Sequence, residues 1–151
     1  MTVIECRERS SALIACLVAV WEDSVRATHT FLSEEEIGVI KAFVPQALAG
    51  VEHLVVLTED DGSYAGFMGV QDHRLEMLFL TAQTCGKGYG RKLLEEGLAR
   101  YGVDTLTVNE QNLQAVGFYE HMGFRTYRRT DLDEEGRPYP LLYMVRKDAK
   151  A

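Results

Sequence analysis

Apolar and polar positions along the chain follow two periods, which predict a mixture of helices and strands. Apolar residues recur at helical spacing in stretches that begin near residues 10, 33, 91 and 112. Short apolar or alternating runs fill most of the chain between them. Strands are therefore expected at residues 2–6, 53–58, 64–71, 74–80, 105–108, 124–131 and 141–145. The first helix is expected to begin at residue 10 or 11 and to end where its pattern fades, at 24–30. Three further helices are expected at 33–48, 91–101 and 112–122.

Capping and turn residues divide these elements. Ser33 and Glu36 have the spacing of a capping box at a helix start. Asp61-Gly62 predicts a hairpin turn, and Pro45 is expected to kink or shorten the helix in which it falls. The resulting order is β-α-α-β-β-β-α-β-α-β-β. It predicts an α/β fold with a mixed sheet and helices on both faces.

Length and composition limit the classes of protein that fit. With 151 residues, 46% of them hydrophobic and 26% charged, we expect one globular domain over residues 1–151. The net charge of −7 argues against nucleic-acid binding and suits a neutral or cationic substrate. No apolar run reaches the roughly 18 residues of a membrane span, and charges at residues 5–9 interrupt a signal-peptide pattern. The three cysteines lack disulfide or metal spacing, which predicts a cytoplasmic protein without a metal site.

The clearest chemical signal is a strand-length apolar run that leads through a glycine-rich loop into a helix. Gly86, Gly88 and Gly90 are separated by single residues, with Lys87 and Arg91 beside them. Glycines let the backbone approach a ligand, and a helix start presents unpaired N–H groups to an anion. The loop is a candidate pyrophosphate site, although a simple turn before a helix also explains the glycines. Its G-x-G-x-G spacing fits neither the dinucleotide fingerprint nor the P-loop.

A second segment narrows the ligand class. It has an asparagine at a helix start, an alanine three residues later, an aromatic-tyrosine pair and a Gly-Phe pair, namely Asn112, Ala115, Phe118, Tyr119, Gly123 and Phe124. Together with the glycine loop, this pattern resembles the GNAT superfamily of acetyl-CoA-dependent N-acetyltransferases. The order of elements resembles that fold along nearly the whole chain. The stretch W-x-x-S-V-x-A-T-H-x-F-L at residues 21–32 is similar to small bacterial members.

The resemblance implies a GNAT acyltransferase fold, in which a mixed, mostly antiparallel sheet splays between its fourth and fifth strands and is flanked by about four helices. Pantetheine would lie in that gap, paired with strand amides and bonded by Asn112, and the glycine loop would hold the pyrophosphate. Core packing and helix capping are the alternative roles of the strand residues and Asn112. The implied cofactor-binding residues are Leu78, Phe79, Leu80, Cys85, Gly86, Lys87, Gly88, Tyr89, Gly90, Arg91, Asn112 and Phe118.

One position departs from the family motif [QR]-x-x-G-x-G. Aligning the helix that follows Gly90 places Cys85 where the family has Gln or Arg. A frame that begins at Gln83 also satisfies the motif but leaves the helix start two residues late, so we prefer the Cys85 frame. Backbone amides are expected to retain most of the phosphate binding. Both an oxidation-sensitive and a passive thiol remain open for Cys85.

Acetyl transfer to an amine requires a deprotonated nucleophile, a polarised carbonyl and a proton for the departing thiolate. The resemblance implies that Tyr119 is the general acid, with a core tyrosine as the alternative. Glu76, expected to face opposite to Leu75 and Met77, and His29, between the first two helices, are the candidate bases. A solvated carboxylate and a structural histidine are their alternatives. The resemblance also implies that the candidate walls of the acceptor site are Trp21, Thr28, His29, Phe31, Tyr139 and Tyr143. A core role is the alternative for Phe31 and the preferred interpretation for Trp21.

The sequence therefore predicts an N-acetyltransferase that moves an acetyl group from acetyl-CoA to a primary amine by direct transfer in a ternary complex. It is expected to act as a monomer or homodimer, without a nucleic-acid, membrane or metal partner. The alternative is a non-catalytic acyl-CoA-binding sensor or regulatory module. A third possibility is a nucleotide-binding protein that uses the same loop for ATP.

Overall fold

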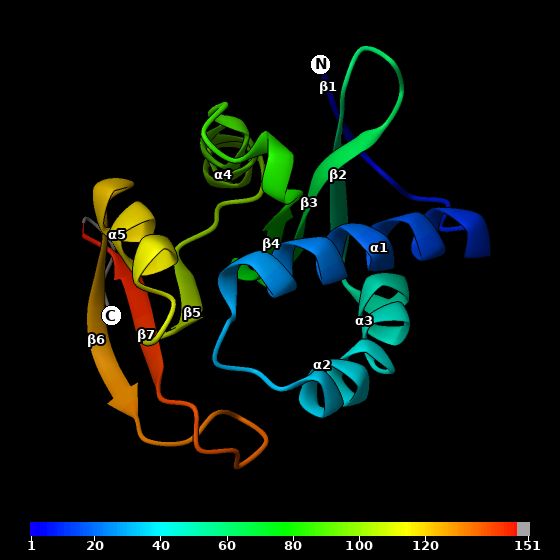
Figure 1. The fold of residues 1–151 in the computed structure, drawn as a ribbon. Coiled ribbons are helices and arrows are strands. Elements are labelled where there is room, and N and C mark those ends of the chain that lie inside the picture. Colours follow the sequence, from blue (N-terminus) through cyan, green and yellow to red (C-terminus); the bar gives the residue numbers. More distant parts are fainter. Residues whose placement is uncertain (148–151) are drawn as a thin grey trace.

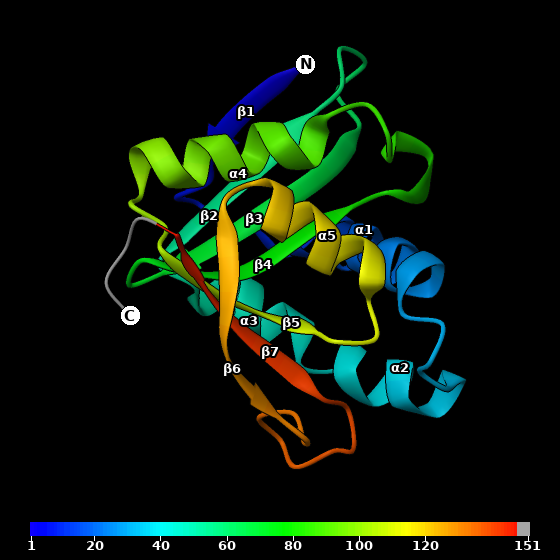
Figure 2. The same ribbon diagram turned by 90° about the vertical axis from the view of Figure 1, so that its left-hand side faces the viewer.

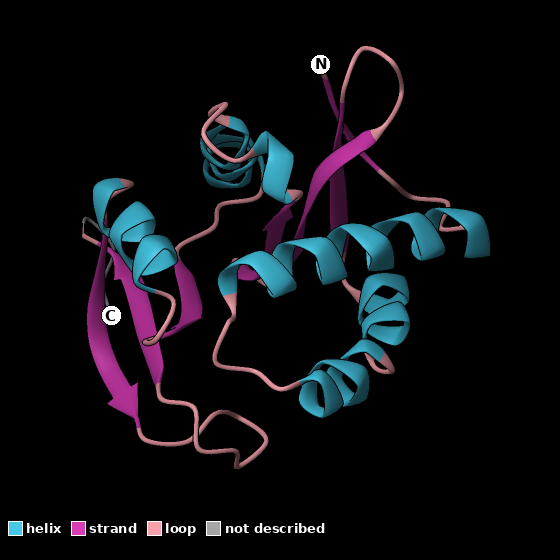
Figure 3. Cartoon of the chain, in the orientation of Figure 1, coloured by secondary structure: helices cyan, strands magenta, loops and turns pink. Residues whose placement is uncertain are grey.

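The computed structural model describes residues 1–147, in which seven strands form one sheet flanked by helices (Figure 1, Figure 3). The strand order in the sheet is β1-β2-β3-β4-β5-β7-β6. The strands are β1 (Thr2–Glu5), β2 (His53–Thr58), β3 (Tyr64–Gln71), β4 (Arg74–Leu80), β5 (Thr105–Asn109), β6 (Phe124–Thr130) and β7 (Leu141–Arg146). The helices are α1 (Ser11–Thr28), α2 (Glu34–Lys41), α3 (Val44–Gly50), α4 (Tyr89–Arg100) and α5 (Leu113–His121), with a short 3₁₀ turn η1 (Ala82–Thr84).

The sheet opens between β4 and β5. These two strands run parallel and are in register only where Arg74 and Leu75 pair with Thr105 and Leu106. Beyond Leu75, β4 stays paired with antiparallel β3 as far as Leu80, while β5 pairs along its length with antiparallel β7. Figure 2 shows β4 and β5 diverging from that point. The mixed, mostly antiparallel sheet with a splay between strands 4 and 5 is confirmed.

Helices cover both faces of the sheet. In Figure 2 α4 lies in front of β2, β3 and β4, and α3 lies behind them with α1. On the α4 side, Leu93 and Leu94 pack with Phe124 from β6. On the other side, Leu17 and Leu48 pack against Phe67. Each helix is therefore held by an apolar stripe that its own period places toward the sheet.

The second predicted helix is broken, as Pro45 predicted. It forms α2 and α3, and Pro45 lies in the first turn of α3, where its missing N–H costs no helical hydrogen bond. The capping box at the start of α2 is present: Glu36 N–H donates to Ser33 Oγ over 3.1 Å, and Ser33 N–H donates to Glu36 Oε1 over 3.0 Å. α4 begins two residues before the predicted position, because Gly88 adopts a left-handed conformation and serves as its N-cap.

Arg9 fastens the chain after β1 to the end of α3. The last carbonyls of a helix have no partner within the helix. The Arg9 guanidinium supplies donors to this region, and the carbonyl oxygens that it reaches at 2.5–3.2 Å belong to Cys6, Leu48, Ala49, Val51 and Glu52. It thereby holds one end of the α1 and α3 layer against the sheet.

Replacing Arg9 by alanine is expected to lower the free energy of unfolding by about 1.5–3 kcal/mol, since hydrogen bonds from a charged donor to partly buried carbonyls are lost. The measurement is the urea midpoint of unfolding. Arg7→Ala, a change at an exposed cation of the same segment, is the control and should leave the midpoint nearly unchanged. Equal midpoints for the two variants would show that the Arg9 bonds do not stabilise the fold.

Within residues 1–147, no helix combines the length and the apolar character that crossing a membrane requires.

Candidate active site

A cleft of about 330 Å³ follows the line along which β4 and β5 separate. Its walls come from the second half of β4, the loop before α4, the start of α4, the first turns of α5 and the end of α1. The structure thus brings together nearly all the predicted cofactor-binding residues. Those that line the cleft are Leu78, Phe79, Leu80, Cys85, Gly86, Gly88, Tyr89, Gly90, Arg91, Asn112 and Phe118.

The glycine loop leaves the start of α4 open. Gly86 and Gly88 have φ angles of +87° and +82°, which side chains rarely tolerate, and a Cβ atom at either would meet no atom within 4 Å. Gly88 is the N-cap of α4 and has no side chain to bond the helix amides. The first N–H groups of α4 and the positive end of its dipole therefore face a space suited to an anion. These residues fit a pyrophosphate.

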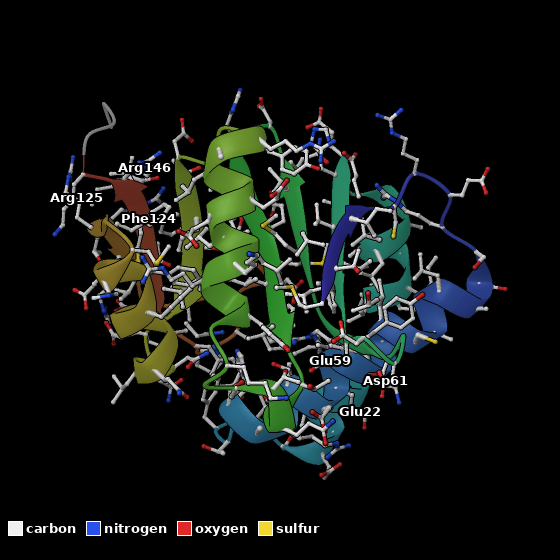
Figure 4. All side chains as sticks on the ribbon, turned by 90° about the horizontal axis from the view of Figure 1, so that it is seen from above. Glu22, Glu59, Asp61, Phe124, Arg125 and Arg146 are labelled. Atoms are coloured by element: carbon white, nitrogen blue, oxygen red, sulfur yellow. The ribbon has the colours of Figure 1, made fainter. Side chains whose placement is uncertain are left out.

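Glu59 holds this loop from outside the cleft. Tyr89 donates a hydrogen bond from its hydroxyl to the Glu59 carboxylate over 2.8 Å, and Lys87 Nζ lies 3.6 Å from the same carboxylate. Glu59, labelled in Figure 4, lies just after β2, in the turn that joins β2 to β3. Lys87 is thus engaged by a distant carboxylate and does not line the cleft, whereas Arg91 does.

Cys85 lies at the entry to the loop and is exposed. Its thiol donates to the Thr81 carbonyl oxygen over 3.7 Å. Because α4 begins at Tyr89, Gly90 falls in its first turn. Because the helix follows directly after Gly88, its start does not separate the Cys85 frame from the Gln83 frame, and the Cys85 frame stays a prediction.

A smaller cavity of about 180 Å³ continues the cleft between β4 and β5. The two spaces share wall residues, including Leu78, Phe79 and Asn112. The three predicted catalytic residues, His29, Glu76 and Tyr119, all line this inner cavity. They come from the C-cap of α1, from β4 and from α5, which are far apart in the sequence. The geometry therefore brings the candidate acid and the two candidate bases to one common space.

Glu76 reaches the inner cavity because β4 bulges at this residue. Leu75 is paired with Val70 and Met77 with Gly69, so Glu76 is the extra residue on the β4 side. The expectation that Leu75 and Met77 share a face is wrong: Leu75 packs in the cluster on the α4 side and Met77 in the cluster on the α1 side. A bulge re-aims a side chain in this way. The Glu76 carboxylate is partly exposed and lies 3.8 Å from Arg74 Nε.

Tyr119 is a buried phenol beside both spaces. Its ring packs against Phe118 and Phe124, with centroid distances of 5.3 and 6.2 Å. Burial raises its pKa well above the ordinary value, so the hydroxyl stays protonated at neutral pH. Tyr119 is carried by α5, whose N-cap is Asn112, and the Asn112 side-chain oxygen accepts from Ala115 N–H over 3.3 Å. Asn112 thus caps the helix while it lines the cleft.

His29 ends α1 and faces both spaces. It is the C-cap residue, and its ring lies 5.4 Å from that of Phe31. Burial lowers the pKa of His29 below its ordinary value of 6.5, so the ring is neutral at neutral pH. A neutral imidazole can accept a proton.

Of the residues predicted to line the acceptor site, Phe31 and Tyr139 contact each other, whereas Trp21 and Tyr143 pack in other parts of the fold. Their rings are 5.4 Å apart, and Tyr139 donates a hydrogen bond to Glu36, so the loop after α1 contacts the β6–β7 connection. Trp21 is 5% exposed and belongs to the core. Tyr143 packs against Tyr127 and Arg128 on β6.

Ser24 and Gln114 also line the cleft and were not singled out from the sequence. Each is an ordinary polar residue on a helix. Ser24 and Gln114 reach the cleft only because α1 and α5 pack on either side of the open sheet.

Fold and site together define an acyltransferase of the GNAT class. The family model for an acetyltransferase (GNAT) domain matches residues 24–139, and the chain belongs to that family. The peptidyl-lysine N-acetyltransferase YjaB of Escherichia coli K12 is 41% identical over 133 residues, which cover 85% of this chain and 87% of YjaB.

The solved structures agree in fold. The solution structure of apo-form YjaB from Escherichia coli has a TM-score of 0.85 at 37% identity, over 99% of this chain and 100% of that one. The structure of yncA from Salmonella typhimurium with its cofactor acetyl-CoA has a TM-score of 0.67 at 20% identity, over 100% and 96% of the two chains. The likeness to yncA is one of fold alone.

Proposed function

We propose that this acetyltransferase transfers the acetyl group of acetyl-CoA directly to the side-chain amine of a lysine in a protein or peptide. The observation that carries the proposal is the inner cavity, which His29, Glu76 and Tyr119 all line and which shares wall residues with the larger cleft. The relatives named peptidyl-lysine N-acetyltransferase support the acceptor class. The net charge of −7 suits a cationic acceptor.

Acetyl-CoA would occupy the cleft with its two ends held by different parts of the chain. The amides at Gly86 to Gly90 and the start of α4 bind the pyrophosphate. The free edge of β4 at Leu78 to Leu80 offers backbone groups to the amides of the pantetheine arm, because β5 has moved away from it. The thioester supplies the activated acetyl group. With the pyrophosphate and pantetheine bound in this way, the thioester would lie between the cleft and the inner cavity.

The catalytic residues then divide the proton transfers. His29 takes a proton from the acceptor ammonium, and the free amine attacks the thioester carbonyl carbon. As the new C–N bond forms, the C–S bond breaks, and Tyr119 gives its proton to the departing thiolate. The amide nitrogen returns a proton to the tyrosinate, and His29 later releases its proton to solvent. The products are an acetylated amine, CoA thiol and one proton.

His29 is the favoured base over Glu76. His29 is neutral at neutral pH and lines both spaces. Glu76 is partly exposed and lies beside Arg74, which offsets part of its charge, and its carboxylate remains available at the cavity wall to attract the acceptor's ammonium group. If His29 is the base, its lowered pKa moves the acidic rise of kcat/KM below pH 6.5, because the base must lose its proton to act.

The test is acetylation of a panel of lysine peptides. We expect release of CoA thiol, and mass spectrometry should find one acetyl group on the lysine side chain. Matched peptides with arginine or dimethyl-lysine in its place are the controls and should show neither signal. If CoA binds but no amine supports turnover, the chain is a sensor or regulatory module. Thermal stabilisation by ATP greater than that by CoA would instead support the nucleotide-binding alternative.

A further inference from the structure

The hydroxyl of Thr28 lies between a backbone carbonyl of α1 and the ring of His29. The Thr28 hydroxyl oxygen lies 2.8 Å from the carbonyl oxygen of Ser24 and 2.8 Å from Nδ1 of His29. A hydroxyl has one proton to donate, and a carbonyl oxygen only accepts. Thr28 therefore donates to Ser24, and His29 Nδ1–H must donate to Thr28. The lone pair of the neutral ring is then on Nε2.

We infer that Thr28 is a positioning residue for acetyl transfer, which holds His29 in the Nδ1–H tautomer and leaves Nε2 free to accept the proton of the acceptor amine. The inference rests on the proposed role of His29 as the general base. In metal and catalytic sites, the partner of one histidine nitrogen likewise sets the chemistry of the other.

The surroundings of the Thr28–His29 pair suit the positioning role of Thr28. Ser24 is buried in the penultimate turn of α1, so its carbonyl is a fixed acceptor, and Ser24, Thr28 and His29 all line the cofactor cleft. His29 follows the last turn of α1, where the carbonyl end of the helix dipole stabilises an imidazolium once it forms. Burial lowers the pKa of His29, so the ring is neutral before it accepts a proton.

The other polar groups around His29 come from three directions. Glu76 on β4 and Tyr119 on α5 line the inner cavity together with His29. Beyond Phe31, the Glu36 carboxylate accepts a hydrogen bond from Tyr139 and is thereby engaged. Thr28 thus binds Nδ1 of His29. The inner cavity, into which Nε2 would accept a proton, is also lined by Tyr119 and Glu76.

The experiment compares Thr28→Val with Thr28→Ser in the full chain. Long-range ¹H–¹⁵N correlation spectra of the free enzyme report the tautomer of His29 without any need for turnover, with His29→Ala used for assignment. The wild type and Thr28→Ser should show Nδ1–H. Thr28→Val keeps the shape but removes the acceptor, so the proton should move toward Nε2, and kcat should fall roughly tenfold to a hundredfold with an unchanged KM for acetyl-CoA.

Thr30→Val, at an exposed position just beyond the pair, is the matched control and should keep both tautomer and kcat. An Nε2–H tautomer in the wild type would overturn the inference, as would a Thr28→Val variant that changes tautomer and retains its kcat. Full activity of His29→Ala would instead overturn the proposed base, and with it any catalytic role of Thr28. An inactive His29→Ala together with Nε2–H in the wild type would overturn the tautomer alone.

Discussion

Replacing Gly88 by valine is expected to raise the Kd for CoA about a hundredfold or more, because at least two charge-assisted hydrogen bonds of about 1.5–3 kcal/mol each would be lost. A side chain at Gly88 enters the open space in front of the α4 amides, which is the space that the pyrophosphate needs. The affinity can be measured by isothermal titration calorimetry with CoA. An unchanged Kd would refute the pyrophosphate assignment.

The φ angle of +82° at Gly88 makes a strain control necessary. A side chain in that conformation costs about 1–2 kcal/mol of stability wherever it is placed. Gly62→Val is the matched variant, since Gly62 has a φ of +87°, has open space around its Cβ position and lies in the β2–β3 turn. The two variants should lose similar stability, and only Gly88→Val should lose affinity for CoA.

The order of elements and the glycine loop could be predicted from the sequence because local chemistry fixes them. Pro45 cannot lie in the interior of a helix without disrupting it, and it is found in the first turn of α3. Gly88 readily adopts the left-handed conformation that it has as the N-cap of α4. These features depend on single residues and their immediate neighbours. The resemblance then supplied what periodicity could not, namely that β4 and β5 part and leave a cleft.

What the sequence did not reveal depends on contacts between distant segments. The bulge at Glu76 is set by pairing with β3, so the simple alternation of the strand misled. Lys87 is next to a predicted anion site, but Glu59 from another turn engages it. The proton position on His29 depends on which way Thr28 donates, and only the three-dimensional contact with Ser24 decides that.

Replacing Tyr119 by phenylalanine is expected to lower kcat by about 10²–10⁴-fold, the range for loss of a general acid. The Kd for CoA should hardly change, because the ring contacts with Phe118 and Phe124 remain. Stability should also be kept, since within residues 1–147 no side chain or carbonyl accepts a hydrogen bond from this hydroxyl. The raised pKa of Tyr119 implies that the wild type should show no alkaline fall in kcat/KM from this group below pH 10.

Tyr101→Phe separates the chemistry of Tyr119 from the general effect of removing a phenol. The Tyr101 hydroxyl donates to the Glu5 carboxylate over 2.8 Å, and Tyr101 does not line the cleft or the inner cavity. Its loss should lower the free energy of unfolding by about 1.5–3 kcal/mol and leave kcat unchanged. Turnover measurements and urea midpoints should therefore give opposite patterns for the two variants. If Tyr119→Phe instead loses stability and keeps its kcat, Tyr119 is a packing residue, and the proton for the thiolate comes from elsewhere.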